Sequence, residues 1–461
     1  MYERRLHPEA GLRNWRKPLL IGSAAAASLA LAGCGAQYRP VVSAINPVGP
    51  ASQPTKYAVA ISNPGSNSPG LLTIVDFAGD TVLSTPQILS NPTYLALGTG
   101  GGQGFVINSN GSFNEFGTSN PTGLISSGVS QTTLSAGASP VSITPVSLAN
   151  SSSLVFVPEP GLSQVAALST SGSLQQNIAV PNDPVYVVAT DGASRAYAIS
   201  QGGASVSSIE SGNLAVSGTI PVGNTPVYGV MTPDATRAFI LNKGSGTVSV
   251  INVINNGPDL AMPTIPASGT LGLNPVWADL SPTTTELVVL NQGDGVHPGS
   301  LSIINIPLCS ATAQATNPNC NPANPVDATG FGTVVATVPV GVNPVMVSVL
   351  QDGTKAYVAN AGNASAGIEG SVSVVNLASG TVQATIPAVS AASATVDTTT
   401  SPTAVYGHPN SIAATTGTPT GRVYVTSPDN KYMTVIETDT NAVLTHINLQ
   451  GTGVRVLVTS Q

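Results

Sequence analysis

The sequence carries very little charge. Only 8% of its 461 residues are Asp, Glu, Lys or Arg, about a third of the roughly 25% typical of soluble domains. A disordered chain needs many charges and few apolar residues, so a hydrophobic fraction of 41% excludes that class and predicts a packed core. Because 14 basic residues stand against 21 acidic ones, a nucleic-acid binder that works through a basic surface is excluded as well.

Groups suited to catalysis or metal binding are also scarce. The four histidines, His7, His297, His408 and His446, are far apart and show no spacing typical of metal ligands. The chain has no Gly-x-Ser-x-Gly motif and no phosphate-binding loop. We therefore predict no metal site and no cofactor, and the balance favours a protein without catalytic activity.

Glycine and proline, by contrast, are abundant. There are 48 Gly and 37 Pro residues, and they follow no Gly-X-Y period, which excludes collagen. Their density favours β structure with many turns.

The first residues have the features of an export signal. A basic segment with five Arg and Lys residues is followed by the apolar run 18–33, which is shorter than the ~20 residues that span a bilayer. The run ends in Leu31-Ala32-Gly33-Cys34, which resembles the lipobox of bacterial lipoprotein signal peptides. The resemblance implies that residues 1–33 are removed, that Cys34 receives a diacylglycerol and a further acyl group such as palmitate, and that residues 34–54 form a tether. An ordinary signal peptide with a chance cysteine is the alternative.

This resemblance also implies an address. A lipid-anchored protein stays on a membrane, and we expect the cell envelope, at the outer membrane or cell surface, with the periplasmic face as an alternative. Without the leader, 9 basic and 19 acidic residues remain, a net charge of −10. The expected partners are the membrane and an envelope protein or polysaccharide, with no nucleic acid, and the chain is expected to be a monomer.

The other two cysteines bracket a loop rich in Pro and Asn. Cys309 and Cys320 are predicted to form a disulfide, because an exported protein meets an oxidising compartment. A metal site is the alternative, although no histidine or further cysteine lies nearby.

A repeat runs through most of the chain. Each copy starts at an Asn/Asp/Thr-Pro step or its equivalent, and we use the proline as a marker of register; these marker prolines are Pro92, Pro140, Pro184, Pro226, Pro275, Pro344 and Pro409. Four of the six intervals between them are 42 to 49 residues, and the two long ones contain insertions near 307–330 and 388–407. Four short strands in each copy predict an all-β propeller of four-stranded antiparallel blades.

Three segments carry a family resemblance: AYVANAG (356–362), SVSVVNLASGTVQATIPA (371–388) and RVYVTSPDN (422–430). They resemble the YVTN-repeat family of β-propellers. The resemblance implies an exported or surface protein, and relatives of the same general shape include lactonases.

The two ends of residues 55–461 are predicted to join in one blade. Residues 451–460 match an inner strand with Val454 at the marker position, and they complete the strands that precede Pro92. This closure gives a single domain of eight blades. Seven blades, and an inner strand at Pro40 to Pro47, are the alternatives.

Several polar residues recur at fixed places and are interpreted as turn residues. Asp191, Asp234 and Asp352 are each followed by a basic residue, which is expected to pair across the hairpin tip; these partners are Arg195, Arg237 and Lys355. The same interpretation is given to Asn242, Asn291 and Asn360, which end second strands.

The most suggestive site is an aromatic column. Tyr94, Tyr186, Tyr228 and Trp277 lie two residues after a marker proline, and Met346 continues the series in a chain with only 4% aromatics. Equal register predicts equal height, so these side chains form either a binding platform at the channel mouth or core between blades. Asp279 is a weak catalytic candidate, and Arg455 also lies on an inner strand.

Three functions remain open. The first is a lipid-anchored propeller that binds or scaffolds protein or carbohydrate without catalysis. The second is a lactonase-like or glycan-active enzyme that uses the channel mouth. The third is a structural component of a surface layer.

Overall fold

The computed structural model describes residues 56–65, 68–149, 152–260, 262–266, 271–281, 285–306, 330–389, 403–415 and 421–459. The segment from Pro54 to Gln461 is one compact unit. The predicted lipidation site Cys34 and the predicted disulfide partners Cys309 and Cys320 lie outside the described residues. Among the residues that are described, no helix is long and apolar enough to cross a membrane.

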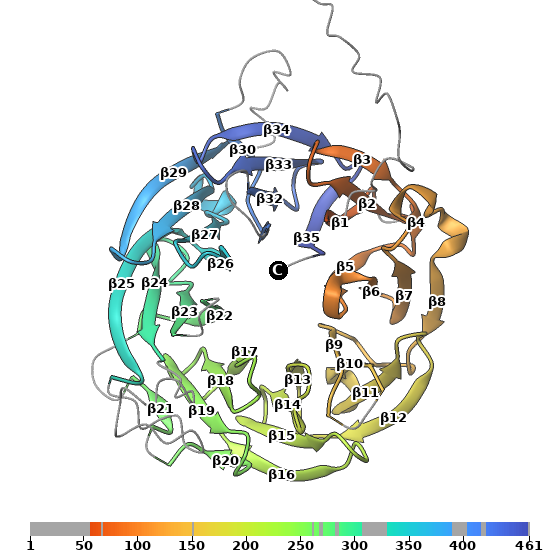
Figure 1. Ribbon diagram of the computed structural model, residues 1–461, viewed down its shortest axis with the longest axis vertical. Coiled ribbons are helices and arrows are strands. Elements are labelled where there is room, and N and C mark those ends of the chain that lie inside the picture. The colour runs from red at the N-terminus through yellow and green to blue at the C-terminus, as the bar shows by residue number, and fades with distance from the viewer. Residues whose placement is uncertain are drawn as a thin grey trace, which may run out of the picture. The chain divides into compact units, whose positions relative to one another are not determined.

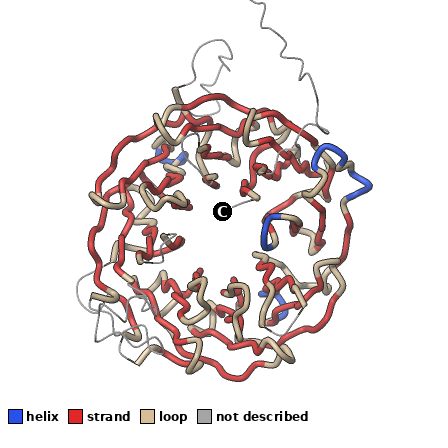
Figure 2. Tube along the Cα trace, viewed as in Figure 1, coloured by secondary structure: helices blue, strands red, loops and turns tan. Residues whose placement is uncertain are grey.

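Eight antiparallel sheets follow one another around a central axis, which is the arrangement of an eight-bladed β-propeller (Figure 1). Strands form nearly all of the regular structure, as Figure 2 shows. The helices of the described chain are short 3-10 turns: η1 (Thr99–Gly101), η2 (Pro121–Gly123), η3 (Ser126–Gly128), η4 (Pro160–Leu162) and η6 (Ala364–Ala366). The sequence prediction of an eight-bladed all-β propeller is confirmed.

We number the blades in chain order and give each from its innermost strand outward. Blade 1 consists of β35 (Thr452–Val458), β1 (Tyr57–Asn63), β2 (Gly70–Asp76) and β3 (Thr81–Ser84), with β4 (Gln87–Ile88) also paired to β2. Blade 2 is β5 (Pro92–Leu97), β6 (Gln103–Asn108), β7 (Ser112–Gly117) and β8 (Ser130–Thr133). Blade 3 is β9 (Thr144–Val146), β10 (Leu154–Glu159), β11 (Gln164–Ser169) and β12 (Leu174–Ala179). Blade 4 is β13 (Pro184–Val188), β14 (Arg195–Ser200), β15 (Ser205–Glu210) and β16 (Val216–Pro221).

The remaining blades depart further from the basic plan. Blade 5 is β17 (Pro226–Met231), β18 (Arg237–Asn242) and β19 (Thr247–Asn252), with β20 (Gly257–Pro258) and β21 (Thr264–Ile265) both paired to β19. Blade 6 is β22 (Pro275–Leu280), β23 (Glu286–Asn291), β24 (Pro298–Asn305) and β25 (Thr333–Val342). Blade 7 is β26 (Pro344–Val349), β27 (Lys355–Asn360), β28 (Ser371–Asn376) and β29 (Thr381–Val389), with β30 (Val405–Tyr406) added in parallel. Blade 8 is β31 (Ser411–Ala414), β32 (Arg422–Thr426), β33 (Tyr432–Glu437) and β34 (Val443–Asn448).

The ring closes where β35 pairs with β1, so a strand from near the C-terminus is the inner strand of blade 1. The predicted joining of the two ends is therefore confirmed, but the predicted register is wrong by one residue. Gly453, not Val454, occupies the marker position, since a bulge follows its pairing with Ser62 just as one follows the pairing of Pro226 with Asn242. Glycine, which has no side chain, takes the place of the proline at this position.

The hydrophobic core lies between blades. One cluster of buried side chains joins Phe156 of β10, Tyr197 of β14 and Ile240 of β18, which belong to three successive blades. Each sheet therefore buries both of its faces against its neighbours, and this explains why the sequence has so few charges.

The asparagines that end second strands are not turn residues. Asn242, Asn291 and Asn360 are fully buried. The amide of Asn360, for example, donates to the hydroxyls of Ser371 and Ser373 on the next strand, at 3.1 and 2.9 Å. A Cβ at Gly341 would lie 2.6 Å from the Asn360 Cγ, so the glycine of the Pro-Val-Gly motif leaves room for the buried amide.

The basic residues that begin second strands were predicted to pair across their own hairpin, and that prediction is wrong for all three. Lys355 donates to the Thr438 carbonyl at 2.6 Å, in the next blade, and Arg195 binds the Val253 carbonyl at 2.8 Å. Arg237 forms a fully buried ion pair with Asp259, with 3.0 Å between Nε and Oδ2. Lys355 and Arg195 therefore link neighbouring blades. Arg237 instead holds the segment after β20 to β18 within blade 5.

Tyrosines of second strands make the same kind of link. The hydroxyl of Tyr357 donates to Asn441 at 2.7 Å, and that of Tyr424 donates to Asp80 at 3.0 Å, in each case in the hairpin of the following blade. The second contact joins blade 8 to blade 1. The recurrent Tyr of the repeat thus links neighbouring blades, whereas the recurrent Asn is bonded within its own blade.

Candidate functional site

The inner strands bring one residue of each blade to the same register, two positions after the marker. The eight residues are Arg455, Tyr94, Ser142, Tyr186, Tyr228, Trp277, Met346 and Ser411. All five residues predicted as an aromatic column therefore share this level. The guanidinium group of Arg455 lies there too, although the predicted register had placed it one residue away. We call this set the channel layer.

The aromatic side chains of the channel layer stack on one another. The ring centroids of Tyr186 and Tyr228 are 4.6 Å apart, and those of Tyr228 and Trp277 are 4.1 Å apart with nearly parallel planes. Burial raises the pKa of both tyrosines well above its usual value. Met346 is 7% exposed and lies against Ser411 of blade 8 instead, with 3.5 Å between Oγ and Sδ.

Arg455 connects opposite parts of the ring. Its guanidinium carbon lies 4.0 Å from the ring centroid of Tyr94 and 5.3 Å from that of Trp277. These three residues belong to blades 1, 2 and 6, so the contacts of Arg455 join side chains of blades that are not neighbours in the ring. Cation-π attraction stabilises the guanidinium in this half-buried place.

The ring faces of the channel layer are thus largely occupied by one another and by Arg455. The same side chains pack against the hydrophobic clusters between blades, Tyr228 against the cluster of blades 5 and 6 and Tyr186 against that of blades 3 to 5. The column residues therefore fit both interpretations. One part of each side chain packs in the core between blades, and another part lines the channel. Whether the layer binds a ligand stays a prediction.

Asp279, the weak catalytic candidate, bridges two blades. One carboxylate oxygen accepts the N–H of Leu280 at 2.9 Å, and the other accepts the N–H of Val349 in blade 7 at 2.8 Å. Burial raises its pKa to about 6, against the opposing effect of the two backbone N–H groups. One oxygen therefore joins the inner strands of blades 6 and 7 and the other is held within β22, which leaves little capacity for acid or base chemistry.

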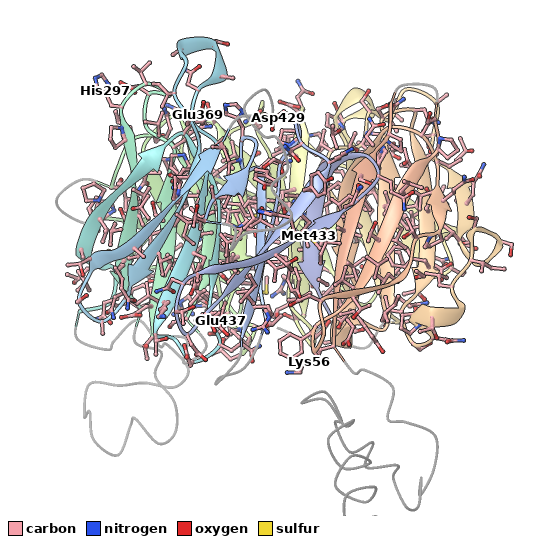
Figure 3. All side chains as sticks on the ribbon, turned by 90° about the horizontal axis from the view of Figure 1, so that it is seen from above. Lys56, His297, Glu369, Asp429, Met433 and Glu437 are labelled. Atoms are coloured by element: carbon pink, nitrogen blue, oxygen red, sulfur yellow. The ribbon has the colours of Figure 1, made fainter. Side chains whose placement is uncertain are left out.

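A polar pocket of about 520 Å³ lies above blades 6, 7 and 8. Its walls include Asn274, Asn343 and His408, each of which directly precedes a marker proline, and the amides of Gln292 and Asn363. We call it the upper pocket, because it opens on the face that carries the labelled residues His297, Glu369 and Asp429 in Figure 3, opposite Lys56 and Glu437.

Hydrogen bonds hold the walls of the upper pocket in place. Gln292 accepts the Lys243 ammonium at 2.8 Å and donates to Asn343 Oδ1 at 2.8 Å. Asn274 donates to the Gly293 carbonyl at 2.8 Å, and Asn363 donates to the Gly295 carbonyl at 2.9 Å. The pocket is therefore formed before any ligand arrives.

Two aspartate–histidine pairs stand at this pocket. Nδ1 of His408 lies 2.7 Å from Asp429 Oδ2, and the backbone N–H of His408 donates to the other oxygen at 2.8 Å. Asp294 lines the pocket and pairs with His297 at 2.6 Å. The backbone N–H of His297, its imidazole and the N–H of Val296 hold the pKa of Asp294 well below its usual range.

The sequence analysis missed this pocket, because its residues were taken for turn residues or for scattered histidines. One signal was present in the repeat itself. The residues before the marker prolines have positive φ in six blades, 58° at Asn274 and 51° at Asn343, and Asn tolerates this left-handed conformation better than most residues. Equal register at these positions places their side chains on one face of the ring.

Among the described residues, no three His, Cys, Asp or Glu side chains lie close enough together to hold a metal ion.

Comparisons with known proteins show a shared shape without close sequence relatives. No protein-family model matches the chain, and no curated protein matches it. The solved structures with a similar fold include dihydro-heme d1 dehydrogenase NirN in complex with DHE, with a TM-score of 0.58 and 11% identity over 88% of this chain and 77% of that one. AztD from Citrobacter koseri has a TM-score of 0.56 and 11% identity over 87% of this chain and 97% of its own.

A third structure, from Bacteroides fragilis, has a provisional assignment as a 6-phosphogluconolactonase. Its TM-score is 0.51, with 12% identity over 89% of this chain and 99% of that chain. These three proteins carry different names, and their identity to this chain is low. The likeness places the chain among β-propellers by fold alone.

Proposed function

We propose that this chain is an exported lipoprotein, anchored through Cys34, whose propeller binds an envelope polysaccharide or protein without catalysis. The observation that carries the binding role is the upper pocket, which is open, polar and held in shape by its own hydrogen bonds. Such preformed concave sites with a few convergent polar groups are typical of ligand-binding sites. The resemblance of the repeats to the YVTN family, whose members are exported, supports the same address.

The position of the pocket suits an anchored protein. Lys56, where the described chain begins, lies on the lower face, whereas His297 and Asp429 mark the upper face (Figure 3). The upper pocket therefore lies on the face opposite the point where the described chain begins.

The anchoring part of the proposal is tested with Cys34→Ser. The wild-type protein is expected in the membrane fraction and to incorporate labelled palmitate, whereas the variant is expected in the soluble fraction without label. A variant that stays acylated and membrane-bound would show that Cys34 is not the lipidation site.

A second candidate function is a lactonase-like or glycan-active enzyme. The pairing of His408 with Asp429 favours it, because a carboxylate that fixes one imidazole nitrogen leaves the other to act as a base. The absence of catalysis is tested by incubating the full-length protein with bound oligosaccharides or lactones and analysing the products. Recovery of the intact ligand supports a binding protein, and turnover that His408→Ala abolishes would establish an enzyme.

A further inference from the structure

The composition of the upper pocket restricts what it can bind. The described residues that line it supply amides, glycines, alanines, one carboxylate and one imidazole, and none of them is Lys, Arg, Phe, Tyr, Trp or a large aliphatic residue. An apolar ligand would find no apolar side chain larger than alanine to cover its surface. It would also expel water from the polar groups of the wall and leave those groups without a hydrogen-bond partner. The ligand must therefore be polar over most of its surface.

The charge of the pocket excludes a second class of ligand. Asp294 is fully ionised near neutral pH, because three groups of its own hairpin hold its pKa well below the usual range. The ammonium of Lys243 does not line the pocket, and it donates to Gln292 behind the wall. A phosphorylated or carboxylated ligand would meet this negative charge, and no Lys or Arg side chain among the described lining residues would compensate it.

The pocket offers hydrogen-bond acceptors together with an imidazole nitrogen. The Asn274 amide nitrogen is held by Gly293, which leaves its carbonyl oxygen to accept a hydrogen bond. His408 is fixed at Nδ1 and at its backbone nitrogen by Asp429, which orients Nε2, and Asp294 adds an accepting carboxylate. A matching ligand needs groups that both donate and accept, as hydroxyl groups do.

We propose that the upper pocket binds a neutral oligosaccharide, with Asn274, Asp294 and His408 as its main hydrogen-bonding contacts. Uncharged sugars satisfy the three conditions above, and a volume of about 520 Å³ accommodates a short oligosaccharide segment. This inference rests on the proposed binding function and names the ligand class and the residues that select it. It also separates this pocket from the channel layer, where the aromatic faces are already covered.

The test uses the full-length protein in detergent and a panel of short oligosaccharides. Neutral probes are maltotriose, cellotriose and tri-N-acetylchitotriose, and the anionic probe is trigalacturonate. Calorimetry is expected to show saturable binding of at least one neutral trisaccharide and none of trigalacturonate. Asn274→Gly and His408→Ala are each expected to weaken that binding about tenfold or more, the equivalent of a lost hydrogen bond to a polar ligand.

The matched control is Asn91→Gly. Asn91 also precedes a marker proline and has a φ of 55°, close to the 58° of Asn274, but it lies in blade 2 and does not line the pocket. Glycine accepts this φ without strain, so both variants are expected to fold. Asn91→Gly is expected to bind the sugar as the wild type does.

A further variant tests the role of charge. Asp294→Asn keeps an oxygen acceptor for the hairpin N–H groups, so it is expected to fold and to raise the affinity for trigalacturonate relative to the neutral sugars. No change in that ratio would overturn the electrostatic part of the argument.

The other outcomes separate this inference from the proposed function. Sugar binding that Asn274→Gly and His408→Ala leave unchanged would place the ligand elsewhere and overturn the inference. Capture of an envelope protein, with no affinity for any neutral sugar, would overturn the inference and keep the binding function. Failure to bind any envelope component would overturn both.

Discussion

Two aspartates of blade 6 show how differently the propeller uses the same side chain. Asp279 lies on the inner strand β22, where burial raises its pKa to about 6 and two backbone N–H groups occupy its oxygens. Asp294 lies on the exposed hairpin between β23 and β24, where hydrogen bonds from His297 and Val296 hold its pKa down. The first aspartate links blades, and the second lines an open pocket.

The comparison extends to their surroundings. Around the axis, the aromatic groups of the inner strands pack on one another, as in the stack of Tyr228 on Trp277. Above blades 6 to 8, the amides are fixed at one end and leave groups for a ligand. The contacts inside the ring therefore serve stability, whereas the upper face carries the proposed binding site.

The largest effect is expected when the stack is broken. Tyr228→Ala removes the ring that lies between Tyr186 and Trp277, and should lower the free energy of unfolding by about 3 kcal/mol, as for other large aromatic residues replaced by alanine. Chemical denaturation measures the change. Binding of ligand by the folded fraction is expected to be unchanged.

The opposite result would reverse the comparison. If Tyr228→Ala keeps wild-type stability but loses ligand binding, the channel layer is the binding platform. Tyr228→Phe is the matched control, since it keeps the stack and removes only the hydroxyl.

The next effect is a pH dependence of stability from Asp279. Its pKa is raised from 3.8 in the unfolded chain to about 6 in the folded one. The folded state therefore binds the proton more tightly, and the stability it contributes is complete below pH 3.8 and is lost as the pH rises through 6. The loss should be about 2 kcal/mol, allowing for partial solvent access.

Unfolding curves from pH 2 to 8 measure this pH dependence, and Asp279→Asn is expected to remove it because an amide does not titrate. Asp294→Asn provides a control of opposite sign, since a lowered carboxyl pKa stabilises the folded state above the usual pKa and that stability is lost at lower pH. An unaltered profile in Asp279→Asn would refute the assigned environment of Asp279.

The smallest effect on stability is expected at the upper pocket. Lys243→Met removes the ammonium that donates to Gln292 and should change the free energy of unfolding by less than about 0.5 kcal/mol, as for other surface residues. Affinity for the bound oligosaccharide is expected to fall by a few fold, because Gln292 loses one of the bonds that fix it. A stability loss as large as that of Tyr228→Ala would show that the pocket wall is part of the core.

The sequence was sufficient to predict the ring, because marker prolines such as Pro226 and Pro344 recur at intervals that fit four short strands. It also placed Tyr186, Tyr228 and Trp277 at one level. It did not predict that these rings stack on one another, since stacking depends on the radius of the ring and on side-chain directions. Arg455 was misplaced because glycine replaces the marker proline in blade 1.

The upper pocket was harder to foresee. Its walls come from hairpins and strand starts of three blades, and residues such as Asn274 and Gly293 have the composition of ordinary turns. The distance between these residues depends on the rotation from one blade to the next, and no local sequence pattern predicts that rotation. The burial of the asparagines was missed for a related reason. Asn360 stands two residues before Gly362, and this pattern is also typical of a turn.

The closure through β35 also governs the order in which the molecule can form. Tyr57 and Thr459 are hydrogen-bonded to each other although they are 402 positions apart in the chain. Until β35 has been synthesised, β1 presents an open edge, and blades 1 and 8 lack their common partner. Contacts of such long sequence separation form slowly, so an exported chain of this design would need protection from aggregation until its last strand arrives.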